Sequence, residues 1–380
     1  MGAKPDPVMT TTVLPDLVSG SRAERGRARS ASCEPRAGLL VALLAVLAPC
    51  GCARPSVPEA PPARLADTGL YADFAARTLA PGVLTFTPQY PLWTDGAAKE
   101  RWIALPPGTT IDASDPDHWE FPVGTRLWKE FRFGRPIETR FMMRRADGTW
   151  AYATYQWRED GSDAVRAPDA GVRNACPTGD TTGHDLPAVG DCRLCHEGTR
   201  TPVLGFSALQ LSPARDPLAP HADAPEPGDV DLDELVARGL VRGLPPEWRT
   251  DPPRIAARSA RERAALGYLH ANCGNCHNAV GPLARLGLRL DYPLAGDGLS
   301  PALATALDAP SGFVRPGLTQ RIAPGRPDRS TLVHRLGATD PLARMPPFGR
   351  YLVDDEALAL LGEWIAVDLA GAPLSHALAK

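Results

Sequence analysis

The chain is 380 residues long and carries 41 lysine and arginine residues against 44 aspartate and glutamate residues, for a formal net charge of −3 at neutral pH. This length allows two or three domains, and a hydrophobic content of 43% is enough for sizeable cores. The weak negative charge argues against a nucleic-acid-binding protein. The 41 prolines and 35 glycines indicate a loop-rich fold with short helices and strands.

The N-terminus has the pattern of an export signal. Residues 21–36 are rich in arginine, and residues 38–48 form a short apolar run, which is the order of an n-region and an h-region. The run is too short to span a bilayer stably. We predict that residues 1–52 are a lipoprotein-like signal peptide with Cys50 or Cys52 as the lipidated residue; plain secretory cleavage is the alternative. Either outcome places the protein in the periplasm or on a membrane of the cell envelope.

The segment after the signal is predicted to be a spacer. Residues 1–52 contain 6 basic and 4 acidic residues, so the mature chain carries 35 and 40, a net charge of −5, which favours basic or neutral partner surfaces. Residues 53–64 contain four prolines and are predicted to be a proline-rich tether. Residues 70–77 resemble a short helix.

Residues 65–175 are predicted to form a β-rich domain. The segments 101–105, 125–133, 138–144 and 150–157 are aromatic and partly alternating, and turns rich in Pro, Gly and Asp separate them. We expect an antiparallel, sandwich-like domain. Its aromatic side chains are expected to form the core rather than a platform on which a ligand stacks.

Residues 176–250 are loop-rich, with a short helix predicted at 231–240, and they contain the motif Cys192-x-x-Cys195-His196. C-x-x-C-H is the attachment signature of a c-type haem, in which both thiols bond to the haem and the histidine binds its iron. Cys176 lies outside the motif and has no assigned role. This segment is therefore predicted to be a first haem-binding region.

A second copy, Cys273-x-x-Cys276-His277, lies in a domain predicted to span residues 251–372. A zinc ribbon fits poorly, because residues 196–272, 77 in all, separate Cys195 from Cys273. A thioredoxin-like C-x-x-C fits poorly as well, because that motif follows a strand and does not require the histidine. We therefore predict two covalently bound haem c groups.

The second motif has a helical frame. Ser259 and Glu262 have the spacing of a capping box at the start of a helix that runs into the motif. Asp354 is the expected N-cap of a final amphipathic helix, and Met345 lies between the two helices. Helix, motif, long loop, methionine and final helix is the order of a class I cytochrome c domain. The predicted fold class is therefore α+β and multidomain.

His277 is the predicted proximal ligand of the second haem, and Met345 the predicted distal ligand. A thioether ligand raises the reduction potential of haem iron, which suits electron transfer. For the first haem, His196 is the predicted proximal ligand and the sixth position stays open. The candidates for it are His184, His221, His270, Met142, Met143 or no residue at all, in which case the iron can bind a small ligand.

At this point the chain resembles a family of exported dihaem c-type cytochromes with an N-terminal β domain. The resemblance covers roughly residues 65–370. It lies in the stretches 90–101, 120–125, 138–140 and 186–187, in 268–278 around the second motif, in Pro324-Gly325-x-Pro327 with Ser330 and Arg335, and in Met345-Pro346-Pro347. The resemblance implies haem binding and electron transfer, and it implies no substrate.

The expected function is electron transfer in the cell envelope between a partner oxidoreductase and an acceptor. The expected partner is a redox protein, and no nucleic acid is expected. An electron carrier is favoured over an enzyme, because no catalytic residues stand out apart from the haem motifs. Two alternatives remain: a dihaem peroxidase-like enzyme with an open first haem, and a β domain that docks on a dehydrogenase or binds a glycan.

Overall fold

The aromatic segments of the N-terminal half form one antiparallel sheet of six strands. The computed structural model describes residues 58–176, 183–296 and 298–371; the predictions for residues 1–52, with Cys50 and Cys52, lie outside them. The prediction of antiparallel β structure is confirmed. In spatial order the sheet contains β3 (Val83–Thr85), β4 (Ala98–Ala104), β6 (Arg126–Phe133), β7 (Arg135–Arg144), β8 (Trp150–Trp157) and β9 (Ala164–Arg166).

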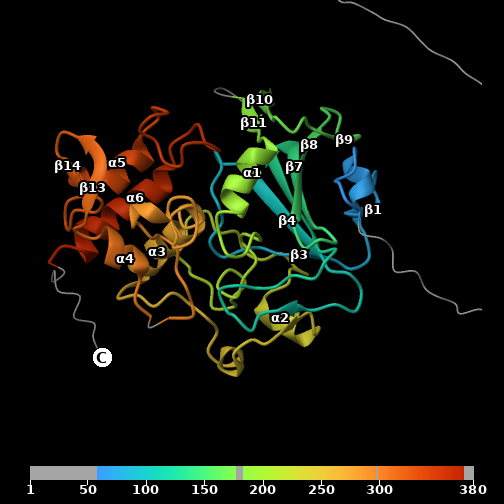
Figure 1. The fold of residues 1–380 in the computed structure, drawn as a ribbon, viewed down its shortest axis with the longest axis horizontal. Coiled ribbons are helices and arrows are strands. Elements are labelled where there is room, and N and C mark those ends of the chain that lie inside the picture. Colours follow the sequence, from blue (N-terminus) through green and yellow to red (C-terminus); the bar gives the residue numbers. More distant parts are fainter. Residues whose placement is uncertain (1–57, 177–182, 297, 372–380) are drawn as a thin grey trace, which may run out of the picture. The chain divides into compact units, whose positions relative to one another are not determined.

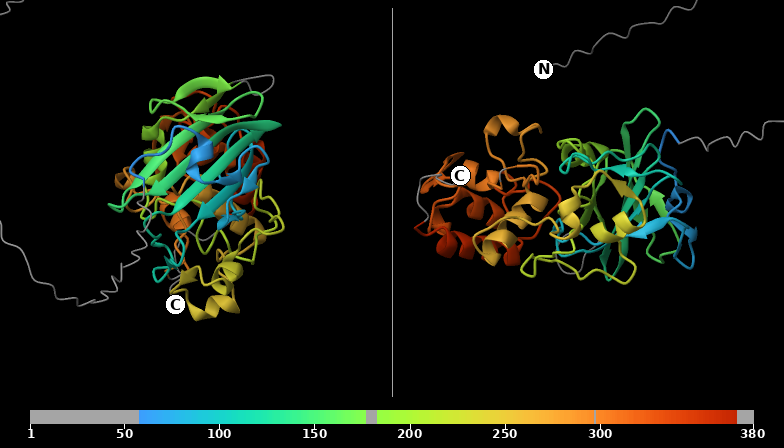
Figure 2. Two further views of the ribbon diagram at one scale, coloured as in Figure 1. Left: turned by 90° about the vertical axis from the view of Figure 1, so that its right-hand side faces the viewer. Right: turned by 90° about the horizontal axis from the view of Figure 1, so that it is seen from below.

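Both faces of this sheet are buried. Successive side chains of a strand point to opposite faces, and each face carries buried hydrophobic side chains. One face carries Trp102, Trp128 and Tyr155 and is covered by the N-terminal segment, drawn in blue in Figures 1 and 2. The other face carries Leu127 and Met142 and packs against later segments of the chain. Figure 1 shows helix α1 (Val189–His196) on that side of the sheet. The aromatic side chains therefore form the core, as predicted.

The N-terminal segment is not the helix predicted at residues 70–77. Gly69, with φ of +80°, ends a 3₁₀ helix at Leu65–Thr68 and turns the chain. Strand β1 (Tyr71–Asp73) then pairs with β2 (Thr78–Leu79). The ring of Tyr71 packs edge-on against Trp102, with 6.5 Å between ring centroids. Burial against the sheet overrides the local helical preference.

The sandwich-like arrangement is also wrong. In the described ranges every sheet other than the six-stranded one has two strands, so no second sheet of comparable size faces it. The C-terminal end of the proline-rich segment contributes to the covering layer: the Tyr155 hydroxyl donates to the Pro62 carbonyl (2.8 Å), and Arg64 forms an ion pair with Asp163 (2.9 Å). Residues 61–64 are thus part of the folded body.

Three further strand pairs tie later segments together. Residues 203–241 share a core with the sheet, so the first motif region and the β region pack as one. The pairs are β5 (Ile111–Asp112) with β12 (Val241–Arg242), β10 (Val172–Cys176) with β11 (His184–Leu186), and β13 (Pro310–Arg315) with β14 (Leu318–Gln320).

Helices dominate the C-terminal part of the described chain, which confirms a mixed α+β fold. Figure 1 shows α3 to α6 gathered together in orange and red. Among the described helices, none combines the length and apolarity needed to cross a bilayer. The helices after α1 are α2 (Leu232–Ala237), α3 (Ala260–Asn272), α4 (Pro301–Ala306), α5 (Thr331–Gly337) and α6 (Asp355–Glu363).

Helices α3 and α6 start at the predicted caps and pack against each other. The Ser259 side chain accepts from the Glu262 N–H (2.9 Å), and the Asp354 side chain accepts from the Ala357 N–H (3.1 Å). The Asp354 carboxylate also accepts from the Tyr268 hydroxyl of α3 (2.9 Å). These contacts fix the end of α3, and Cys273 follows directly as its C-cap residue.

Candidate functional site

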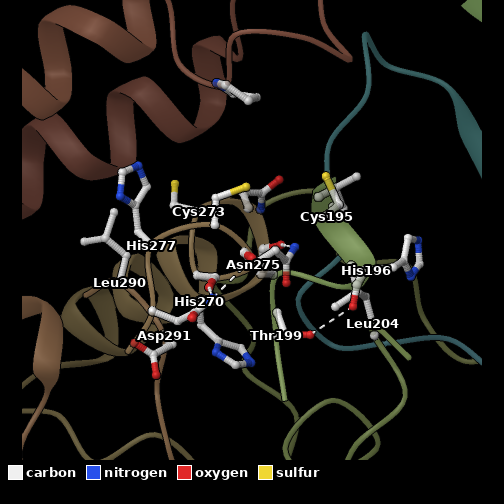
Figure 3. Close-up of a pocket in the computed structure, with 18 of the residues that line it drawn as sticks. Cys195, His196, Thr199, Leu204, His270, Cys273, Asn275, His277, Leu290 and Asp291 are labelled. Atoms are coloured by element: carbon white, nitrogen blue, oxygen red, sulfur yellow. Dashed lines mark hydrogen bonds between the residues drawn. The ribbon is translucent and has the colours of Figure 1, made fainter. Parts of the chain in front are cut away.

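Both C-x-x-C-H motifs line a single cavity of about 1760 Å³. An ordinary ligand pocket has a volume of roughly 300–1,000 Å³, so this cavity is larger than the pocket of one small ligand. Figure 3 shows Cys195 and His196 on one side and Cys273 and His277 on the other, with Asn275 between them. The first motif lies within helix α1, whereas the second follows the end of α3. Two motifs far apart in the sequence therefore share one site.

The loops that carry the two motifs are in direct contact. The side chain of Asn278, which is 6% exposed, donates to the Gly198 carbonyl of the first motif region (2.9 Å) and to the Gly274 carbonyl of its own (2.9 Å). Its oxygen accepts from the Gly281 N–H (2.7 Å). A Cβ atom on Gly281 would lie 2.5 Å from the Gly198 carbonyl oxygen, so only glycine fits there.

The thiols of the two motifs meet at the same contact. A hydrogen bond joins the side chains of Cys195 and Cys276. Burial raises the pKa of Cys192 to about 11 and that of Cys273 to about 12, so both thiols stay protonated at neutral pH. In the described part of the chain, no three His, Cys, Asp or Glu side chains converge as metal ligands.

His196 has the arrangement of a metal-binding imidazole. Burial lowers its pKa to about 4, so the ring is neutral at pH 7. Its Nδ1–H donates to the Pro202 carbonyl (2.6 Å), which leaves the Nε2 lone pair free; a backbone carbonyl on the other ring nitrogen is the usual support of a histidine ligand. The ring packs beside Tyr152 of the sheet, with centroids 5.4 Å apart.

His277 also lines the cavity. Its pKa is lowered mainly by burial and further by the positive charges of Arg335 and Arg321. Its buried Nδ1 has no hydrogen-bond partner among the described residues. Met345, the predicted distal ligand of the second haem, lines the same cavity, and its N–H donates to the Arg335 carbonyl (2.9 Å). The structure thus brings the seven predicted site residues to one cavity: Cys192, Cys195, His196, Cys273, Cys276, His277 and Met345.

The candidate sixth ligands of the first haem are not all available. His184 bonds through Nε2 to the Glu138 carboxylate (2.6 Å), and His221 bonds to Asp354 (2.7 Å); neither lines the cavity. Met143 is buried on the opposite face of the sheet. His270 and Met142 do line the cavity. However, His270 accepts the Tyr292 N–H at Nδ1 (3.1 Å), so its neutral form carries the proton at Nε2.

Glu138 holds a buried charge network beside the first motif. Its side chain has no exposed surface, and its carboxylate accepts from the Arg140 Nε–H (2.6 Å) and pairs with His184. Burial raises the pKa of Glu138, but Arg140 and His184 outweigh it and hold the pKa below the usual range. Breaking such a pair by removing one partner leaves a buried charge without compensation.

We expect Glu138→Gln to lower the free energy of unfolding at pH 7 by about 2–4 kcal/mol. Since the folded pKa is depressed, the contribution of Glu138 is present above its unfolded pKa and is lost as the pH falls through the folded value. Urea unfolding from pH 7 to pH 3 should show the two proteins converging in acid. Glu100→Gln, which removes the half-exposed partner of Arg132, is the control and should cost under about 1 kcal/mol. Equal stabilities at pH 7 would contradict this assignment.

Sequence reasoning missed the side chains that arrange the site. Arg101, Lys129 and Arg140 line the cavity from three neighbouring strands, and Asn278 locks the two motifs together. Arg101 and Arg140 lie in stretches that carried the resemblance, but only the strand register places them beside Lys129. No local pattern could have linked Asn278 with Gly198, because 79 residues separate them.

No protein-family model, no curated protein and no solved structure matches this chain.

Proposed function

We propose that the chain is a dihaem c-type cytochrome that transfers electrons in the cell envelope, between a partner oxidoreductase and an acceptor. The observation that carries the proposal is the convergence of both C-x-x-C-H motifs on one large cavity. Each motif alone has the pattern of a haem-attachment site, and both line the same cavity. The same residues also support the proposed resemblance to exported dihaem cytochromes.

Each motif has a defined role in this proposal. Cys192 and Cys195 would hold the first haem covalently, and Cys273 and Cys276 the second. A bound haem supplies a one-electron Fe(III)/Fe(II) couple. The neutral imidazole of His196, oriented by its bond to the Pro202 carbonyl, offers Nε2 as a ligand. His277 would act in the same way at the second iron.

Met345 would complete the second site from the distal side. Its thioether would favour the reduced iron and would keep external ligands from binding to it, which suits a relay. Contact between the motif loops through Asn278 and Gly198 would hold the two haem-attachment motifs beside each other. The C-terminal region, from α3 through Met345 to α6, would then serve as a class I cytochrome c domain.

The proposed partner is a redox protein, because an electron carrier needs a donor and an acceptor. The proposed location is the periplasm, or a membrane of the envelope if Cys50 or Cys52 is lipidated. Export fits the chemistry, because covalent attachment of c-type haem needs an exported chain with reduced thiols. A redox partner would meet the net negative surface of the mature chain with basic or neutral groups.

Covalent haem content tests the proposal directly. We expect the intact mass of the purified full-length chain to exceed its sequence mass by two haems, and Cys192→Ala/Cys195→Ala and Cys273→Ala/Cys276→Ala each to lose one. Cys176→Ala, outside both motifs, is the matched control and should keep two. A chain matured with the c-type attachment machinery that still carries no covalent haem would refute the function.

A second candidate function is a dihaem peroxidase-like enzyme, in which the first haem is open. The observation that favours it is the state of the candidate sixth ligands: His184 and His221 are bonded elsewhere and lie off the cavity. Cyanide or carbon monoxide should then change the spectrum of the first haem, and peroxide should be turned over with a reduced donor. A first haem that ignores both ligands would exclude this candidate.

A further inference from the structure

The sheet face beneath the first motif is divided into rows by the strand register. One row runs Ile103–Leu127–Met142–Tyr152 across four strands, and it is apolar apart from the tyrosine hydroxyl. The next row on the same face, two residues along each strand, runs Arg101–Lys129–Arg140–Thr154. Two residues of a strand span about 7 Å, so three basic side chains lie one step from the apolar row.

This cationic row is costly unless an anion compensates it. Like charges directly opposite each other on neighbouring strands are destabilising, yet Arg101 faces Lys129 and Lys129 faces Arg140. Arg140 is paired with Glu138. Arg101 is 8% exposed, and within the described ranges neither Arg101 nor Lys129 forms a side-chain hydrogen bond or an ion pair that could neutralise it.

Contacts within the protein only partly offset the charges. The Lys129 ammonium lies 5.0 Å from the centroid of the Phe131 ring, and the Arg140 guanidinium lies 4.3 Å from it. A cation over an aromatic ring gains about 0.5–1 kcal/mol at an exposed site and more when desolvated, but it does not neutralise the charge. Asp223 and Asp229 act on Arg101 from a distance without reaching ion-pair contact.

The row points to a ligand because it lines the cavity beside the first motif. Arg101, Lys129 and Arg140 are all cavity-lining, and His196 packs on Tyr152 of the adjacent apolar row. A ligand seated here meets an apolar wall first and a line of cations next. That order suits an apolar body with acidic groups at one end, and arginine binds carboxylates and other oxyanions through two parallel N–H bonds.

We propose that Arg101, Lys129 and Arg140 form a carboxylate-binding row in the wall of the first site. The carboxylate can have two sources: the propionate groups of the haem attached to Cys192 and Cys195, or a free small oxyanion that binds beside it. The first source rests on the proposed haem function, whereas the second does not. In both cases the three cations hold the acidic end of the ligand, and Met142 and Tyr152 contact its apolar part.

The test compares Arg101→Gln, Lys129→Gln and the double variant in the full-length chain. Arg135→Gln is the matched control, because Arg135 belongs to the same strand as Arg140 but does not line the cavity. Arg101→Lys keeps the charge and separates lost charge from lost packing. Two quantities are measured at constant ionic strength. The first is the shift of the thermal unfolding midpoint when acetate or sulfate replaces chloride. The second is the reduction potential of the first haem, which is recognised as the haem whose spectrum does not change when Met345 is substituted.

If the row binds a free oxyanion, acetate or sulfate raises the thermal midpoint of the wild-type protein. The apparent affinity for that anion then falls at least tenfold in Arg101→Gln and in Lys129→Gln, but not in Arg135→Gln. If it binds the propionates, added anions have no effect, and the potential of the first haem falls in both row variants, since a lost cation favours Fe(III). Row variants that match Arg135→Gln in both measurements overturn the proposal. Haem content is measured on the same samples. A chain without haem refutes the proposed function, and the oxyanion measurement still tests whether the three basic residues bind an anion.

Discussion

Replacing Met345 with leucine is expected to lower the reduction potential of the proposed second haem and to open its iron to carbon monoxide. Met345 lines the cavity with His277 and is the methionine proposed to supply the distal thioether. Leucine keeps nearly the same volume, so packing changes little. Axial ligands set haem potentials over a range of about 0.8 V, and we expect a fall on the order of 0.1 V or more.

Redox titration and visible spectra with and without carbon monoxide measure this effect. Met143→Leu is the matched control, because Met143 is buried on the other face of the sheet, away from the cavity. It should leave both haem spectra and both potentials unchanged. If Met345→Leu keeps a low-spin second haem that ignores carbon monoxide, another residue supplies the distal ligand.

Asn278→Ala is expected to loosen the contact between the two motifs and to destabilise the protein by about 2–3 kcal/mol. The substitution removes the side-chain donor shared by the Gly198 and Gly274 carbonyls and the acceptor of the Gly281 N–H. The hydrogen bonds to the Gly198 and Gly274 carbonyls are buried, so these two carbonyls lose their partner without gaining water. We also expect the two proposed haems to titrate more nearly as independent centres, since the hydrogen bond that holds the two motif loops together is gone.

Urea unfolding and a redox titration test the role of Asn278. Asn275→Ala is the matched control: its amide donates to the Ala271 carbonyl of the preceding helix (3.0 Å) and does not reach the first motif. It should cost less than about 1 kcal/mol and leave the titration curve unchanged. An Asn278→Ala protein as stable as Asn275→Ala, with unchanged redox coupling, would show that the motifs are held together by other contacts.

The sequence predicted the regular elements well where their signals are local. The four aromatic segments are strands, and helices α3 and α6 begin at Ser259 and Asp354 as expected. Capping and alternation depend on residues a few positions apart, so they are readable in the chain. The predictions failed at residues 70–77 and for the sandwich, because both depend on what packs against the sheet.

The candidate site divides in the same way. The two C-x-x-C-H motifs and Met345 follow from short patterns and chain order, and the haem chemistry that they indicate stays a prediction. The sixth ligand of the first haem could not be chosen from the sequence, because a histidine can bind iron only if the fold leaves its ring nitrogen free. In the structure His184 is hydrogen-bonded to Glu138, and His221 is hydrogen-bonded to Asp354. Only the folded structure shows which imidazoles already have hydrogen-bond partners.

The sequence by itself determined which residues carry the proposed chemistry, because attachment thiols and their histidine are adjacent in the chain. The tertiary structure alone decided that both motifs share one cavity, that Asn278 bonds to Gly198, and that Arg101, Lys129 and Arg140 form one row. These arrangements bring together residues from 11 to 81 positions apart in the chain. Strand register and loop packing create such contacts, and no local pattern encodes them.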